Sequence, residues 1–307
     1  MPNLKDIKSR IMSVENTKKI TRAMKMVAAA KVKKAESTVK AGRPFSDELI
    51  VAFKKLLAAV SDYSSEGLTF KLPIENYPEL LKKREVKTVG FLIITSNKGL
   101  AGAYNANIIR NVLKQIQEYK EKGITSKLFI VGQKGISSLK RKISESEVEI
   151  IQTYTKVANE ISAAGAEAIA EDLAENFVSG KIDSIEIFTT KFKNMMSYSA
   201  EKWELLPISV SAEEGEDLGL NPLMVFEPSQ QTILQKLVPL YITNTIYQAL
   251  LEAQASELAS RMTAMSAASN NAEEMIRTLT IDYNKARQWA ITQEILEVVS
   301  GADALKG

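Results

Sequence analysis

Hydrophobic and small residues near the C-terminus repeat at a helical spacing over an unusually long distance. From Leu258 to Gln293 they recur at alternating steps of four and three residues. The series comprises Leu258, Met262, Met265, Ser269, Ala272, Ile276, Leu279, Tyr283, Ala286, Ala290 and Gln293. A repeat of about 3.5 residues over roughly five heptads predicts a left-handed coiled coil. We call this row of positions the C-terminal seam; its small residues favour close approach of a partner helix.

A similar pattern opens the chain, where Leu4, Ile7, Ile11 and Val14 follow one another at steps of three, four and three residues. The apolar residues that we expect on this N-terminal seam are Leu4, Ile7, Ile11, Val14, Ile20, Met24 and Val27. Helix breakers are rare at both ends: 39 residues without Gly or Pro separate Pro2 from Gly42, and 61 separate Pro239 from Gly301. The sequence therefore predicts two long helices that pair as an antiparallel coiled coil. The alternative is two separate amphipathic helices packed on a core.

The C-terminal helix is expected to extend beyond its shorter partner. Its last part, residues 290–299 (AITQEILEVV), is rich in apolar side chains. Because no helix of the same chain is left to cover these side chains, we expect another protein to do so.

The middle of the chain alternates between short apolar runs and helical patterns, which predicts a mostly parallel, Rossmann-like sheet with helices on both faces. The expected strands span residues 88–95, 127–132, 148–152, 184–192 and 196–206, and the expected helices span 104–122, 135–142 and 158–179. A tight turn at Lys193-Asn194 joins the last two strands. The expected organisation is thus an N-terminal helix over 1–60, a linker over 61–87, an α/β domain over 88–228 and a C-terminal helix over 229–307.

Composition narrows the possible functions. Cysteine and histidine are both absent, which excludes disulfides, thiol catalysis and any mechanism with an imidazole base. No apolar run approaches the ~20 residues needed to cross a bilayer. The polar start, MPNLKDIKSR, lacks the apolar segment of a secretory signal, so we expect a chain without a leader.

Charge is unevenly distributed. Residues 1–41 carry 11 Lys or Arg and 3 Asp or Glu, a local charge of +8 in a chain whose net charge is +3. Such a basic helix favours an acidic partner, which leaves nucleic acid, lipid headgroups and an acidic protein loop as possibilities. The same segment contains no aromatic residue to stack on bases.

Evidence for chemistry is weak. The loop over residues 96–103 (SNKGLAGA) follows the first strand of the middle domain, where doubly wound folds bind phosphate. A small α/β enzyme using Gly99 and Gly102 is therefore an alternative. However, the loop lacks a third glycine and the chain has no P-loop motif, so we favour a turn that binds no nucleotide. The acidic residues 213–217 and the adjacent pair Glu273-Glu274 predict solvated surface, and no cofactor is expected.

Both ends of the chain also resemble one known family, the gamma subunits of F-type ATP synthases. The resemblance lies in Leu4–Ile11, Asn16–Lys31, Ser260–Met265, Tyr283–Ile295 and Ser300-Gly301-Ala302, with the Arg43-Pro44-Phe45 turn and the Lys98-Gly99-Leu100 loop in the expected places. It implies a non-catalytic rotor shaft that couples ion flow through the membrane ring to ATP synthesis or hydrolysis. The implied partners are the alpha and beta subunits of the catalytic hexamer, the epsilon subunit and the ring of c subunits, with no nucleic acid. The implied location is peripheral, on the cytoplasmic face of a bacterial plasma membrane.

The resemblance also assigns roles to individual residues. Arg287 and Gln288 match a pair that hydrogen-bonds a loop of a beta subunit, which suits a planar guanidinium and a donor–acceptor amide. Met24 matches a position tied to energy coupling. The other residues matched to coupling or to beta-subunit contact are Arg261, Thr292 and Glu294 and the basic stripe Lys18, Lys19, Arg22 and Lys25.

Three features depart from the family pattern. Trp289 is larger than the small residue expected beside Arg287-Gln288, and Ala101 and Ala103 replace glycines of the loop after the first strand. No cysteine-bearing insertion lies between residues 193 and 228, so the thiol switch of the chloroplast form is not expected.

Overall fold

The computed structural model describes residues 4–64, 67–70, 79–143, 148–208, 227 and 229–306. Helices α1 (Leu4–Val60) and α5 (Gln230–Lys306) occupy the two ends of the chain. A small hairpin of β1 (Ser61–Ser64) and β2 (Gly67–Phe70) and a short 3₁₀ helix (Glu79–Leu81) follow α1. Contacts divide the chain into two compact units, one of residues 1–30 with 261–307 and one of residues 31–260.

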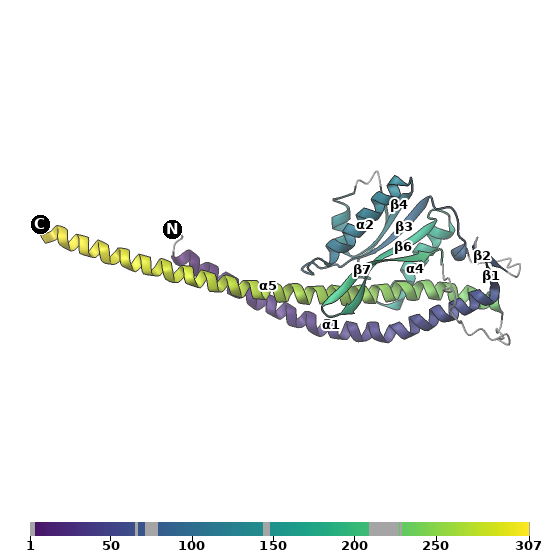
Figure 1. The fold of residues 1–307 in the computed structure, drawn as a ribbon, viewed down its shortest axis with the longest axis horizontal. Coiled ribbons are helices and arrows are strands. Elements are labelled where there is room, and N and C mark those ends of the chain that lie inside the picture. Colours follow the sequence, from purple (N-terminus) through teal and green to yellow (C-terminus); the bar gives the residue numbers. More distant parts are fainter. Residues whose placement is uncertain are drawn as a thin grey trace. The chain divides into compact units, whose positions relative to one another are not determined.

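A five-stranded sheet forms the middle of the second unit (Figure 1), in the order β5-β4-β3-β6-β7. Its elements are β3 (Thr88–Ile94), α2 (Tyr104–Glu121), β4 (Thr125–Val131), α3 (Gln133–Leu139), β5 (Glu149–Tyr154), α4 (Ala163–Val178), β6 (Ser184–Asn194) and β7 (Ser197–Leu206). The first four strands of that order are parallel, and β7 pairs antiparallel with β6. The structure therefore confirms a mostly parallel α/β domain between two long helices.

Several element boundaries differ by a few residues from the sequence-based expectation, and for two of them the structure shows the reason. Helix α4 begins at Ala163 rather than at 158, because the Ser162 hydroxyl accepts a hydrogen bond from the Gly165 amide at 3.2 Å and caps the helix there. The β6–β7 hairpin turns two residues later than predicted, because strand pairing continues to Asn194 opposite Ser197.

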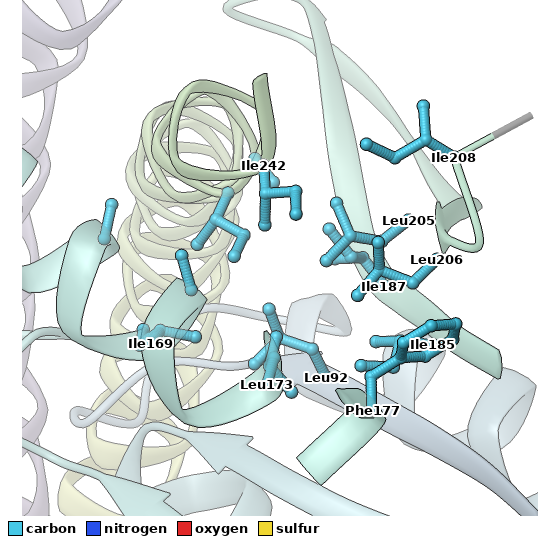
Figure 2. Close-up of a cluster of buried hydrophobic side chains, with 14 of the residues drawn as sticks. Leu92, Ile169, Leu173, Phe177, Ile185, Ile187, Leu205, Leu206, Ile208 and Ile242 are labelled. Carbon is cyan, nitrogen blue, oxygen red and sulfur yellow. The ribbon is translucent and has the colours of Figure 1, made fainter. Parts of the chain in front are cut away.

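Each face of the sheet is covered by its own apolar cluster. On one face, α2 and α3 pack on Val89, Phe91 and Leu128. On the other face, shown in Figure 2, Leu92 of β3 and Phe177 of α4 belong to a cluster that also includes side chains of α1 and α5. Burying large apolar side chains contributes roughly 1.5–3 kcal/mol each, so this second cluster holds the terminal helices on the domain.

The turn expected at Arg43-Pro44-Phe45 was wrong, because α1 continues through Pro44. Val39 and Leu49 on either side of this proline are both buried. Tertiary packing thus keeps the segment helical even though proline removes one backbone hydrogen bond of the helix. The predicted acidic surface over residues 213–217 lies outside the described residues.

Candidate functional site

The paired ends of the helices form the first unit and carry the predicted partner-binding residues. Within it the two segments run antiparallel: Lys18 pairs with Glu273, whereas the more N-terminal Ile7 lines a groove with Ala286 and Trp289 further along α5. From 270 to 290, the seam positions alone are shielded from solvent, and every other residue of that stretch is exposed. The predicted C-terminal seam is therefore confirmed up to Ala290. Gln293, its last expected position, is exposed.

On the N-terminal seam, the heptad position of a residue decides whether it is shielded from solvent, and its hydrophobicity does not. Ile20 and Val27 are 59% and 57% exposed and Met24 is 38% exposed, so the expectation that they lie on the seam was wrong. Continuing the heptad from Val14 by steps of four and three reaches Lys18 and Thr21 instead. These two polar residues are the shielded ones, because a coiled coil keeps its heptad positions inward whatever residues occupy them.

Lys18 shows how a polar residue is accommodated on this seam. Its ammonium lies 3.2 Å from a carboxylate oxygen of Glu273, and its side chain is 30% exposed. The aliphatic part of a lysine side chain covers apolar surface while the charge stays near water. Thr21 in turn donates its hydroxyl to the Lys18 carbonyl at 3.1 Å.

Replacing Lys18 by methionine should stabilise the paired helices by up to about 1 kcal/mol, because apolar residues at such positions pack better and an exposed ion pair contributes little. Thermal unfolding followed by far-ultraviolet circular dichroism measures this effect. The matched control is Lys19→Met at the neighbouring exposed position, which should leave the unfolding temperature unchanged. A lower unfolding temperature for Lys18→Met would contradict the proposed role of the seam.

The end of α5 exposes a row of large apolar side chains. Every residue from Ile291 to Ala302 is exposed. The large apolar residues among them are Ile291, Ile295, Leu296, Val298 and Val299, with exposed fractions of 47–72%. A long isolated helix gains little stability in water without tertiary packing, and exposed apolar surface of this extent is typical of a binding site for another protein.

The residues predicted to contact partners lie mainly on the outer surface of this unit. Arg287 and Gln288 are exposed, and the Arg287 side chain makes no hydrogen bond or ion pair within the part of the chain that the structure describes. The hydroxyl of Thr292 donates to the Gln288 carbonyl at 2.9 Å, which links two of the predicted positions. Also exposed are Met24, Lys19, Arg22, Lys25 and Glu294, whereas Arg261 is only partly exposed.

Trp289 lies beside a groove that composition did not reveal. The groove has a volume of about 740 Å³ and is lined by Asp6, Ile7, Ser9, Arg10, Leu279, Asp282, Lys285, Ala286 and Trp289. The indole is 52% exposed. The large side chain that departs from the family pattern therefore covers part of the outer surface of the helix pair rather than the seam.

The loop after β3 uses its polar groups within the domain. The Ser96 hydroxyl donates to the Lys98 carbonyl at 2.7 Å, and the Asn97 amide donates to the Thr155 carbonyl at 2.7 Å. The Ser260 hydroxyl of α5 donates to the Ala101 carbonyl at 2.7 Å. The cavity at this end of the sheet measures about 20 Å³, whereas pockets for small molecules usually measure ~300–1,000 Å³. Side chains of α5 line the small space that remains at this edge of the sheet.

Further polar contacts join the terminal helices to the sheet, and the sequence did not predict them. Arg43 of α1 forms an ion pair with Glu252 of α5, and the Glu252 side chain is almost fully buried. Nearby, burial raises the pKa of Glu201, but hydrogen bonds from Ser199 and Trp203 together outweigh burial and hold that pKa below its ordinary value. The sequence contains one indication of the ion pair: a charged residue stands among apolar positions in both α1 and α5.

Sequence comparison relates the whole chain to one family. The family model described as ATP synthase matches residues 3–305. An ATP synthase gamma chain of a Synechococcus species is 41% identical over 329 aligned positions, which cover 99% of this chain and all of the relative. The ATP synthase gamma chain of Heliobacterium modesticaldum is 41% identical over 310 positions with the same coverage.

Solved structures show the same architecture. A chain from the central stalk and c ring of the Tetrahymena thermophila mitochondrial ATP synthase is 27% identical, with a TM-score of 0.57, over 81% of this chain and 99% of that one. A chain from the Euglena gracilis mitochondrial ATP synthase reaches a TM-score of 0.64 over 98% of this chain at 17% identity, which shows a shared fold. In the residues that the structure describes, no helix is long and apolar enough to span a bilayer. On its fold and on its similarity over nearly the full length, the chain belongs to the ATP synthase gamma chain family.

Proposed function

We propose that this chain is the central rotor shaft of an F-type ATP synthase and couples ion flow through a membrane ring to ATP synthesis or hydrolysis. As a gamma chain it is a non-catalytic subunit of the complex. The observation that carries the proposal is the end of α5, where every residue from 291 to 302 is exposed and large apolar side chains recur. An apolar helix end that contacts only the surrounding subunits suits a shaft that turns inside them.

The paired helices and the α/β domain of the shaft contact different partners. The paired helices lie inside a hexamer of alternating alpha and beta subunits, and the α/β domain contacts epsilon and the c ring. The Tetrahymena and Euglena structures contain a c ring together with the central stalk or F1, which supports this assignment for the present chain. The chain is then peripheral to the membrane, on the cytoplasmic face in a bacterium.

Within this assembly the predicted residues of the helix pair contact different parts of the surrounding subunits. Arg287 and Gln288 hydrogen-bond a beta-subunit loop, and Arg261, Thr292 and Glu294 belong to the same coupling surface. Met24 lies outside the seam, so its side chain is free to contact the surrounding subunits. The basic residues Lys19, Arg22 and Lys25 face acidic loops of the beta subunits. Because exposed ion pairs are individually weak, they let the shaft move between equivalent positions.

Co-purification tests the proposal. A tag fused through a flexible linker beyond Gly307 should recover two nucleotide-binding subunits in equal amounts, in excess over the tagged chain, together with ATPase activity. A second preparation tagged within the α/β domain controls for a tag that blocks assembly. Recovery of the chain alone, or with nucleic acid whose binding falls steeply with salt, from both preparations would contradict the proposal.

A further inference from the structure

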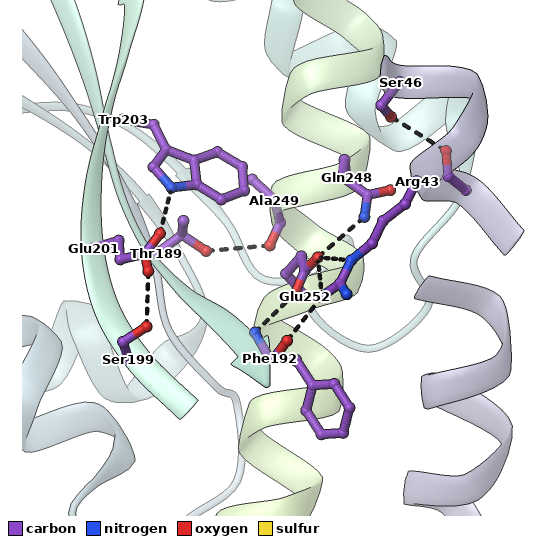
Figure 3. Close-up of polar contacts among 11 residues, drawn as sticks. Arg43, Ser46, Thr189, Phe192, Ser199, Glu201, Trp203, Gln248, Ala249 and Glu252 are labelled. Carbon is purple, nitrogen blue, oxygen red and sulfur yellow. Dashed lines mark hydrogen bonds and ion pairs between the residues drawn. The ribbon is translucent and has the colours of Figure 1, made fainter. Parts of the chain in front are cut away.

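The carboxylate of Glu252 lies where three elements meet (Figure 3), and its residue is 2% exposed. The Arg43 guanidinium of α1 donates Nε to Glu252 Oε1 at 2.9 Å and Nη2 to Oε2 at 3.1 Å. The Phe192 amide of β6 donates to Oε2 at 2.7 Å. Gln248, one turn earlier on α5, donates to Oε1 at 3.2 Å. Both oxygens of this buried carboxylate are therefore fully used.

A further hydrogen bond closes the arrangement into a triangle. Arg43 Nη2 also donates to the Phe192 carbonyl at 2.7 Å. Helix α1 is thereby bonded to α5 and to β6, and α5 is bonded to β6. We call Arg43, Glu252 and the backbone of Phe192 the clamp.

Two neutral contacts flank the clamp on the same elements. The Thr189 hydroxyl of β6 donates to the Ala249 carbonyl of α5 at 3.1 Å. The Asn244 amide of α5 donates to the Ser46 hydroxyl of α1 at 2.9 Å. The clamp is thus the charged centre of a short row of hydrogen bonds between the sheet and both terminal helices.

The clamp lies at the weakest part of α1. Gly42 and Pro44 flank Arg43, and in a helix interior both residues are less favourable than alanine, proline much more so than glycine. Gly42 lets α1 approach α5 closely here, because a Cβ would lie 2.8 Å from Gln248 Oε1 and that side chain would have to move. The clamp therefore stabilises α1 at the same place where α1 approaches α5 closely.

Stability alone does not account for such an arrangement. Removing two charges from water offsets most of their attraction, so a buried ion pair is a weak source of folding free energy. Its hydrogen bonds are directional, however, and a bidentate guanidinium–carboxylate pair resists sliding and rotation of the groups it joins. Apolar packing on the same face is adaptable and resists such displacement less.

We infer that the clamp is the point at which turning force passes between the α/β domain and the two terminal helices. The inference rests on the proposed rotor function and adds the residues that make the rotor rigid. Arg43 and Glu252 act as positioning residues: they hold α1 and α5 against β6 while the domain is turned. Without the clamp, the helices slip or twist against the domain under load.

Two conservative variants of the assembled enzyme test this role. Arg43→Lys keeps the charge but loses the fork and one of its hydrogen bonds, and Glu252→Gln keeps the shape but loses the charge. In membrane vesicles, ATP hydrolysis is measured with an uncoupler present, and ion transport is measured with a voltage-sensitive dye that reports any cation. We expect hydrolysis to be retained, and transport at a matched hydrolysis rate to fall several-fold in both variants.

A matched control lies in the same domain. Lys202 and Glu186 form a second buried pair, with side-chain exposures of 36% and 5% against 36% and 3% for Arg43 and Glu252. Glu186 and Lys202 join β6 to β7, and among the described residues neither side chain has a hydrogen bond or ion pair to a terminal helix. Glu186→Gln should therefore keep the transport-to-hydrolysis ratio of the unmodified enzyme.

The outcomes separate the inference from the function on which it rests. An unchanged transport-to-hydrolysis ratio in both clamp variants overturns the inference, and so does an equal fall in Glu186→Gln. If Glu252→Gln does not assemble, the ratio in Arg43→Lys decides. Failure of the unmodified chain to join an ion-transporting ATPase removes the proposed function instead.

Discussion

Replacing Arg287 and Gln288 together by alanine should leave the chain folded and strongly lower the coupled turnover of the assembled enzyme. Both residues are exposed, so their removal should change the free energy of unfolding by no more than about 0.5 kcal/mol. An arginine at the centre of an interface commonly contributes about 2 kcal/mol or more, so we expect ATP synthesis and hydrolysis to fall roughly tenfold or more. Steady-state assays of both reactions measure this.

A matched pair on the same helix separates a specific contact from a general loss of charge. Arg277 and Thr278 are also exposed, ten residues earlier on α5, and the Thr278 hydroxyl donates to the Glu274 carbonyl of its own helix. Changing both to alanine should leave turnover near that of the unmodified enzyme. Unchanged synthesis and hydrolysis in the Arg287/Gln288 variant would remove the assignment of this pair as a beta-subunit contact.

A single added methyl group at Gly132 should be the most destabilising small change in the α/β domain. Gly132 joins β4 to α3 with φ of 95°, a backbone conformation that other residues rarely adopt. A Cβ there would lie 2.2 Å from the Thr95 carbonyl oxygen, which itself belongs to the backbone and moves little. Backbone strain together with this overlap should cost about 3 kcal/mol or more. A urea titration of Gly132→Ala gives the value.

Gly99 provides the control for this change. It lies in the loop after β3, where a Cβ would meet the flexible side chain of Lys134 at 3.4 Å. Gly99→Ala should therefore change the midpoint of unfolding only slightly. Equal midpoints for the two variants would show that the turn at Gly132 tolerates a side chain, contrary to the geometry described above.

The long helices were readable from the sequence because their signals are local. The C-terminal seam repeats without interruption, and the shielded residues from Ala272 to Ala290 match that repeat. The strands at residues 88–95 and 127–132 were found for a similar reason, since buried parallel strands read as apolar runs. Their observed counterparts, Thr88–Ile94 and Thr125–Val131, differ by at most two residues at any end.

The errors arose where the local signal and the tertiary environment disagreed. Ile20, Met24 and Val27 are apolar, but the heptad geometry turns them outward. Residue type alone does not distinguish an apolar side chain that contacts another subunit from one that lies on the seam. Pro44 is a helix breaker by propensity, yet contacts on either side keep α1 continuous. Propensity is a weak prior that packing overrides in both cases.

The sequence by itself determined the two helices, the α/β class of the domain between them and the family to which the chain belongs, because periodicity and recurring motifs depend on neighbours along the chain. The tertiary structure decided which face of the N-terminal helix is buried and which charges meet. Arg43 and Glu252 are 209 residues apart, and no local pattern links them. They come together because apolar packing places α1, α5 and β6 at one point, where a buried carboxylate must find donors.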